Sequence, residues 1–147
     1  EKKMEEIKNM RAFYRDAVEV NKTVFYQASK RIKDENGEPV FWELKVLSYD
    51  DIKATIEKQT RTVPNKLTGK GEKETNMNQA MIDMVLQAVV FPNLNDAELQ
   101  DSWGVVGAEA LLKELLTAGE IADLIEAVNA AAGYKSELAD KIKTVKN

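Results

Sequence analysis

Apolar residues recur at helical spacing near both ends of the chain. Over residues 2–15 and again over residues 134–146, they fall on one face of an expected helix. Each stripe packs either within the chain or against a partner, so both helices are candidate partner-binding surfaces. The residues of these two stripes are Met4, Ile7, Tyr14, Tyr134, Leu138 and Ile142.

A strand-like pattern occupies residues 18–47. Short runs of β-branched and aromatic residues lie on both sides of Asn36-Gly37, a pair that favours a tight turn because both positions tolerate positive φ. We therefore predict a β-hairpin with strands near 23–33 and 40–47. Because an isolated hairpin is only marginally stable in water, it must pack on helices or on another chain.

Residues 48–60 carry a helix signal. Ser48 is a suitable N-cap, and Ile52 and Ile56 mark the apolar side. A proline, two glycines and three lysines then predict a mobile polar loop over 61–76. Those lysines form either an anionic contact site or the ordinary solvated surface of a loop.

Residues 77–133 are predicted to form a helical core. Their first stretch, 77–91, is apolar on most sides, which is typical of a helix at the centre of a core. The alternative is that Met77, Met81 and Met84 form an adaptable partner surface.

Helix starts and stops are dense between residues 91 and 108. We expect Pro92 to end one helix, Asn95 to cap a short one and Gly107 to open the next. A last core helix is expected from Glu120 to a C-terminal cap at Gly133. The residues of this segment expected to point inward are Leu94, Leu99, Trp103 and Val106.

Together these elements predict one domain over residues 1–147, of the α+β class and mostly α-helical. One N-terminal β-hairpin would pack on a bundle of about five to six helices.

Composition narrows the function. The chain has 147 residues, a net charge of −4, no cysteine and no histidine. The missing side chains are the commonest metal ligand, the usual proton carrier near neutral pH and the thiol nucleophile. No phosphate-binding loop or paired carboxylate replaces them, so we predict a protein without catalytic residues, metal or cofactor. No basic run suggests nucleic acid, and no apolar run reaches the ~18 residues of a membrane span.

Residues 91–112 read FPNLNDAELQDSWGVVGAEALL. This run resembles a segment of the XkdN-like phage tail assembly chaperones, with the pattern Pro-x-Leu, then Glu-Leu-Gln-Asp-Ser-aromatic-Gly-Val-x-Gly. The residues that carry the match are Pro92, Leu94, Glu98, Leu99, Gln100, Asp101, Ser102, Trp103, Gly104 and Gly107.

Two further motifs are similar to the same family and keep its order. One is the hairpin motif Ser-x-Arg-x-x-Asp-x-x-Gly-x-Pro-x-x-Trp over 29–42, and the other is the Leu-x-x-Gly-Glu turn at 116–120. Trp103 stands where tyrosine is common, Ile121 where an aromatic is common, and Ala118 replaces a frequent proline. The matching residues of these two motifs are Ser29, Arg31, Gly37, Pro39, Trp42, Gly119 and Glu120.

The resemblance implies a non-enzymatic chaperone that keeps the tape-measure protein soluble and aids assembly of the tail tube. It implies contact with the tape-measure protein and with the tail tube protein, and it leaves a homo-oligomer open. It also implies a contractile-tailed phage, action in the bacterial host cytoplasm and absence from the mature virion. The alternative is a structural tail or connector component retained in the particle, whose hairpin over 23–47 adds to a neighbour's sheet edge.

Overall fold

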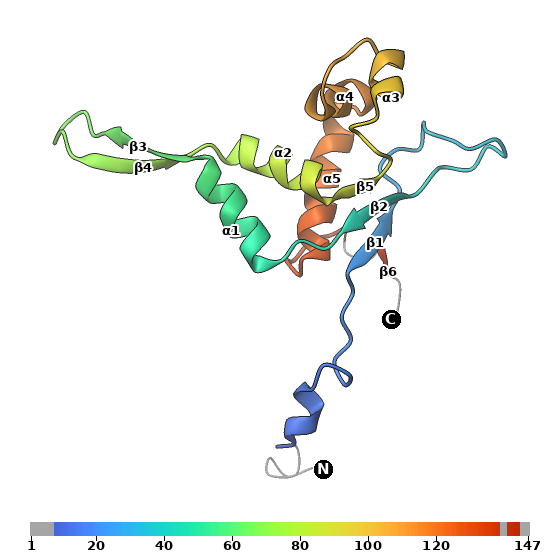
Figure 1. The fold of residues 1–147 in the computed structure, drawn as a ribbon, viewed down its shortest axis with the longest axis horizontal. Helices are drawn as coiled ribbons and strands as arrows, with labels where there is room; N and C mark the ends of the chain where they lie inside the picture. The colour runs from blue at the N-terminus through green and yellow to red at the C-terminus, as the bar shows by residue number, and fades with distance from the viewer. Residues whose placement is uncertain (1–7, 139–140, 145–147) are drawn as a thin grey trace.

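The computed structural model describes residues 8–138 and 141–144, and Figure 1 shows their arrangement. Over this part of the chain there are five α-helices, one short 3-10 helix and six strands in two antiparallel sheets. The predicted fold class was therefore wrong in its emphasis: the fold mixes helices and sheets, and is not a helical bundle with a single hairpin. Within the described residues, none of the helices combines the length and the apolar character that a membrane span requires.

The main sheet contains the predicted hairpin. β1 and β2 pair antiparallel, with Tyr26 opposite Trp42, and the turn between them places Gly37 at φ 80°. The hairpin is thus confirmed, but two other strands flank it. The strands of this sheet, in spatial order, are β5 (Val89–Phe91), β2 (Trp42–Lys45), β1 (Thr23–Tyr26) and β6 (Lys143–Thr144).

Alternate residues of the hairpin face the core, as the two-residue period of a strand requires. Val24 and Tyr26 of β1 and Trp42 and Leu44 of β2 are all buried. Trp42 is 1% exposed, so the signature tryptophan of the hairpin motif is a core residue.

α2 is the central helix, because it contacts three other helices as well as β2 and β5. Its residues Ala80, Met84, Val85 and Ala88 are buried, which confirms the prediction of a core helix here. Residues 89–91 belong to β5 instead, since Val89, Val90 and Phe91 suit a strand and β2 offers them an open edge. The helices are α1 (Tyr49–Lys58), α2 (Met77–Ala88), α3 (Ala97–Ser102), α4 (Ala108–Leu115) and α5 (Ala118–Ala131).

The helix ends follow local capping chemistry. Ser48 caps α1 as predicted: its Oγ accepts from the backbone N–H of Asp51 at 3.1 Å, and the Asp51 carboxylate accepts from the backbone N–H of Ser48 at 3.1 Å. Gly133, at φ 101°, follows the end of α5 as predicted. Asp96 caps α3, where Asn95 was expected, because its side chain is the one that accepts from the third N–H of the helix.

The predicted mobile loop at 61–76 was wrong. β3 (Thr60–Pro64) and β4 (Gly71–Thr75) form a second antiparallel hairpin, which projects from the body in Figure 1. Thr60, Thr62 and Val63 are β-branched, which suits a strand, and Pro64 stands at the strand end, where proline is tolerated. The Asn65 side chain closes the turn by accepting from the backbone N–H groups of Leu67 and Thr68.

The predicted N-terminal helix over 2–15 was also wrong for the described residues. Only a 3-10 helix, η2 (Met10–Phe13), is present, and Met4 and Ile7 lie outside the described residues. An isolated helix of this length gains too little from its own hydrogen bonds, and none of the described residues of η2 is buried.

The predicted C-terminal helix over 134–146 is not formed in its described part. Residues 134–138 are coil and turn, and residues 143–144 pair as β6 with the free edge of β1. Leu138 is buried, and Ile142 packs against the core. The apolar spacing of this segment fits a helix, but the strand edge at β1 and the burial of Leu138 outweigh that local preference.

Candidate functional site

An apolar groove opens where α1, α2 and the end of α5 meet, with a volume of about 350 Å³. We call it the methionine groove. Both signs of charge lie on its lining, one from Glu126 and one from Lys135. Its lining residues are Ile52, Ile56, Met77, Met81, Met84, Glu126, Asn129, Tyr134 and Lys135.

Helical spacing explains why these side chains meet. Ile52 and Ile56 are four residues apart on α1, and the three methionines of α2 follow one another at intervals of four and three. Each set therefore forms one stripe, and the packing of α1 against α2 brings the two stripes together.

Exposure changes along the groove. Met84 is 3% exposed, whereas Met77 is 41% exposed and Tyr134 is 57% exposed. Methionine is unbranched and polarizable, so a methionine-lined surface can adapt to differently shaped apolar side chains. The core interpretation is confirmed for Met84, whereas Met77 and Met81 line the groove and their role as a partner surface stays a prediction.

Beside the groove, the polar side chains Gln79 and Asp83 of α2 are hydrogen-bonded. Asp83 accepts hydrogen bonds from the side-chain amides of Gln59 at 2.8 Å and Gln79 at 3.0 Å. Gln79 also donates to Glu109 of α4 at 2.7 Å. Hydrogen bonds from Lys113 and then Gln79 lower the pKa of the Glu109 carboxyl. These bonds tie α2 to its neighbours and hold the groove wall in place.

A second cluster, the hairpin–helix junction, joins the hairpin to the start of α5. Arg31 Nη2 donates to Glu120 Oε1 at 2.6 Å and to the Leu115 carbonyl oxygen at 2.9 Å. Glu120 also accepts from the backbone N–H of Thr117 at 2.9 Å, which completes a capping box. The junction comprises Ser29, Arg31, Leu115, Thr117 and Glu120.

Electrostatics favour the ionised form of Glu120. The hydrogen bond from Arg31 is the largest cause, and those from Ser29 and Thr117 add to it, whereas partial burial opposes them. Together they hold the pKa of Glu120 at about 2, below its usual 4.5. The junction is a paired, structural ionic contact with no free acid or base.

The sequence model of the phage XkdN-like tail assembly chaperone family matches residues 10–146. This chain belongs to that family. The chaperone also resembles the crystal structure of the protein YqbN, with a TM-score of 0.66 and 18% sequence identity. The likeness covers 88% of this chain and 99% of that one, and at this identity it concerns the fold alone. The search of curated proteins found no match.

The signature segment of the chaperone is a corner rather than a binding cleft. Gln100 holds it together: its side-chain amide donates to the Leu94 carbonyl oxygen at 2.9 Å and its Oε1 accepts from the Gly107 N–H at 2.9 Å. Leu94 is buried and Leu99 packs on the core, as predicted. Trp103 and Val106, expected inside, are 43% and 92% exposed. The short α3 has no buried residue, so it cannot carry them inward.

The other signature residues serve the architecture or lie at the surface. Ser29, Arg31 and Glu120, far apart in sequence, meet at the junction. The residues found at turns or at the ends of helices and strands are Gly37, Pro39, Pro92, Gly104, Gly107 and Gly119. Three residues are exposed on α3, namely Glu98, Asp101 and Ser102.

The structure describes four of the six residues predicted to bind a partner, and two of these four are accessible. Tyr14 is 48% exposed, with the Arg11 guanidinium 5.1 Å from its ring centre, and Tyr134 lines the methionine groove. Leu138 and Ile142 are covered by the fold. The spacing of the methionines and of Ile52 and Ile56 was the signal for the groove, but the meeting of the two stripes depends on packing.

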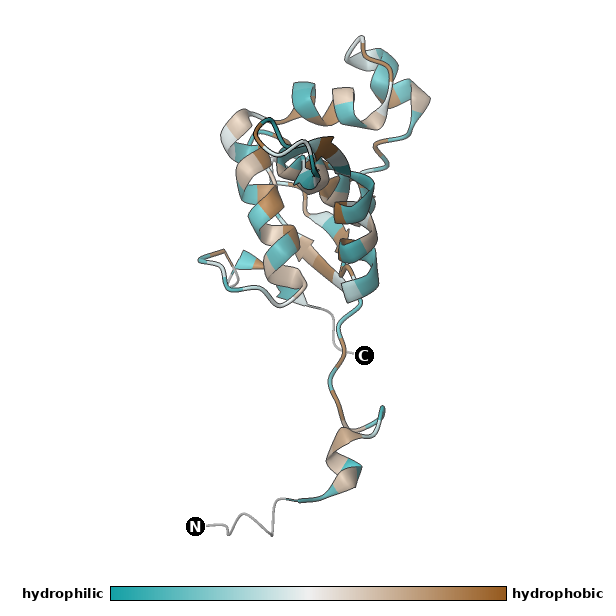
Figure 2. Cartoon of the chain, turned by 90° about the vertical axis from the view of Figure 1, so that its left-hand side faces the viewer, coloured by the Kyte–Doolittle hydropathy of each residue, from teal (hydrophilic) through white to brown (hydrophobic). Residues whose placement is uncertain are grey.

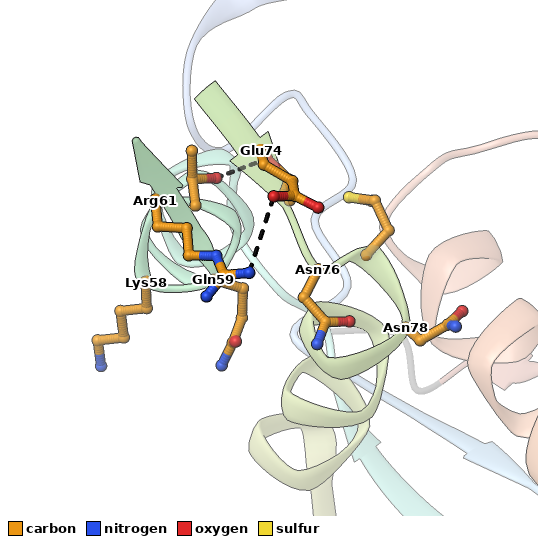
Figure 3. Close-up of a pocket in the computed structure, with 9 residues that line it drawn as sticks. Lys58, Gln59, Arg61, Glu74, Asn76 and Asn78 are labelled. Carbon is orange, nitrogen blue, oxygen red and sulfur yellow. Dashed lines mark hydrogen bonds and ion pairs between the residues drawn. The ribbon is translucent and has the colours of Figure 1, made fainter. Parts of the chain in front are cut away.

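A larger, polar pocket of about 570 Å³ lies at the base of the second hairpin. In Figure 3, Arg61 and Glu74 point toward one another across β3 and β4, with their charged atoms 3.8 Å apart. The Thr60 and Thr75 hydroxyls share a hydrogen bond of 2.7 Å. Within the described residues, no group of three acidic, histidine or cysteine side chains is placed to hold a metal ion.

Proposed function

We propose that this tail assembly chaperone keeps the tape-measure protein soluble by receiving one of its amphipathic helices in the methionine groove. The observation that carries the proposal is the apolar groove lining of Met77, Met81 and Tyr134, of which Met77 and Tyr134 are exposed. A helix presents apolar residues at intervals of three and four, and such a stripe is what a groove between helices accepts.

The size and charge of the groove support this client. A volume of about 350 Å³ is small for a cofactor site and suits a few side chains from one face of a helix. Glu126 and Lys135 offer partners of both signs to the polar flanks of that helix. In this proposal, the tape-measure protein is the client whose apolar helices need cover before assembly.

The remaining parts of the proposal follow from a role limited to assembly. The chaperone acts without catalysis in the cytoplasm of the bacterial host, on a phage with a contractile tail. It delivers the tape-measure protein to the growing tail tube, contacts the tube protein there, and is absent from the mature virion.

Co-expression with the neighbouring tape-measure protein tests the proposal. We expect the chaperone to raise the soluble fraction of that protein and to co-purify with it, and the double variant Met77→Glu, Tyr134→Ser to do neither. Leu67→Ser is the matched control, because Leu67 is 95% exposed at the tip of the second hairpin, away from the groove. An insoluble tape-measure protein with wild-type chaperone, or an unaffected double variant, would contradict the proposal.

A second candidate is a structural tail or connector component retained in the particle. Both strands of the hairpin at 23–47 are interior, so a neighbour would instead add a strand at β5, the edge of the sheet. Val90 and Phe91 of β5 are each 51% exposed, which favours such an addition. Mass spectrometry of purified particles separates the two functions, since a retained component would be present in stoichiometric amounts.

A further inference from the structure

An arm over residues 8–22 leaves the body at the start of β1. Figures 1 and 2 show it extending well away from the helices and the sheet. Met10 is 72% exposed, Phe13 is 75% exposed and Tyr14 is 48% exposed. Three large apolar side chains close together on an exposed segment mark a contact surface that the chain itself does not cover.

The tip of the arm is already shaped for binding. η2 is capped by Asn9, whose side chain accepts from the backbone N–H of Arg11 at 2.9 Å. Met10 and Phe13 stand at positions i and i+3 of this 3-10 turn, so they lie on the same side of it, and Tyr14 follows directly as its C-cap. A preformed turn lowers the entropy lost when the arm is immobilised.

The charged residues of the arm can be compared with those that line the methionine groove. In the arm, the basic residues outnumber the acidic ones, although the whole chain carries −4; the charged residues of the arm are Lys8, Arg11, Arg15, Lys22, Asp16 and Glu19. The methionine groove offers apolar side chains together with Glu126, and its one basic lining residue, Lys135, belongs to the coil after α5. The groove therefore matches the arm in apolar character, and Glu126 supplies one carboxylate for a basic residue of the arm.

We propose that the arm of one copy docks in the methionine groove of a second copy. Phe13 and Met10 fill the apolar groove beside Met77 and Met81, and Arg11 pairs with Glu126. In the structure the arm points away from its own body, which leaves both the arm and the groove open to another chain. A mutual exchange of arms closes a two-fold dimer, because each copy gives one arm and receives one.

Arm exchange gives the chaperone a means of regulation that rests on the proposed function. The arm and a tape-measure helix would occupy the same groove, so client binding releases the arm and self-association excludes the client. The contact between copies itself does not depend on the identity of the client.

Sedimentation velocity on the isolated full chain, without client, tests the contact. We expect a concentration-dependent dimer, with a dissociation constant raised at least tenfold by Phe13→Asp in the arm and equally by Met77→Glu in the groove. Leu67→Asp, equally apolar-to-acidic but remote, should leave the dimer unchanged. A chain that stays monomeric up to high concentration, or a dimer that both variants leave intact, overturns the proposal.

Paired cysteines identify the contact directly, because the chain has no cysteine of its own. Ala12→Cys on one chain and Lys135→Cys on another should form a mixed disulfide under copper phenanthroline, and Ala12→Cys with Leu67→Cys should not. A disulfide formed only within one chain carrying both Ala12→Cys and Lys135→Cys at high dilution would place the arm on its own body and refute exchange. If client solubilisation fails while the mixed disulfide forms, only the proposed function is lost.

Discussion

The hairpin–helix junction and the methionine groove share one helix but differ in every other respect. The first turn of α5 supplies Glu120 to the junction, and its last turns supply Glu126 and Asn129 to the groove. The junction is polar and paired, and it is built from residues of the family motifs. The groove is apolar and open, and its lining residues lie outside those motifs. The family residues at the junction thus hold the fold together, and the proposed binding surface lies outside the family motifs.

The largest expected effect is a loss of stability at the junction that leaves binding at the groove unchanged. Glu120→Ala removes both the partner of Arg31 and the reciprocal half of the α5 cap, so unfolding should cost about 2 kcal/mol less. Urea denaturation followed by circular dichroism measures this. The folded variant should still bind the tape-measure protein with wild-type affinity; a loss of affinity without a loss of stability would show that the junction is itself a binding site.

Acid should weaken the junction and spare the groove. Because the folded chain holds the pKa of Glu120 at about 2 against a usual 4.5, the unfolded chain takes up its proton first. The stabilisation is complete above the unfolded pKa and is lost as pH falls from about 5 to about 2. We expect the stability of Glu120→Gln, from denaturant unfolding at each pH, to fall less steeply over this window than wild type. Parallel curves would contradict the assignment.

The groove should respond in affinity and not in stability. Met77→Glu with Tyr134→Ser removes two exposed apolar contacts and adds a charge, so affinity for a tape-measure fragment should fall at least about tenfold, or about 1.4 kcal/mol. The free energy of unfolding should change by less than about 0.5 kcal/mol, because both side chains are exposed and an acidic residue suits the first turn of α2. Calorimetric titration and urea denaturation together test this pair of outcomes.

A smaller effect is expected where the groove depends on a helix cap. Ser48→Ala removes the N-cap of α1, the helix that carries Ile52 and Ile56, and should lower stability by about 1 kcal/mol. Ser48→Asp retains an acceptor at the cap and should recover most of that loss. Thermal unfolding of the two variants provides the comparison, and equal melting temperatures would show that the cap contributes nothing.

The smallest effect is expected at the tip of the second hairpin. Leu67→Ser alters a side chain that is 95% exposed and distant from both regions. Stability should stay within about 0.5 kcal/mol of wild type, and client affinity should be unchanged. A clear loss of affinity here would identify the second hairpin as part of the client site.

Prediction from sequence succeeded where the signal is local. The Asn36-Gly37 turn, the cap at Ser48 and the end of α5 at Gly133 each depend on the chemistry of a few adjacent residues. The family could be identified from the sequence for a similar reason, because the match depends on the order and spacing of the motifs along the chain.

Prediction failed where distant segments compete for the same backbone. Residues 143–144 join β1 as a strand because that edge is open to them, and residues 89–91 leave the helical pattern to pair with β2. The terminal stripes fit amphipathic helices by spacing alone, but the described part of the first stripe is exposed, and Leu138 and Ile142 of the second pack on the core without forming a helix. Trp103 is exposed because α3 is too short to pack it inward.

By itself, the sequence determined the cap of α1 and the end of α5, the first hairpin, the core character of α2 and membership in the chaperone family. Only the tertiary structure decided that Arg31 meets Glu120, that the stripes of α1 and α2 meet in one groove, and that the N-terminal arm stands free. The physical reason is the distance along the chain over which each interaction acts. Capping and turn formation act between neighbours in the chain, whereas grooves, ion pairs and sheet edges depend on which surfaces remain after the core has packed.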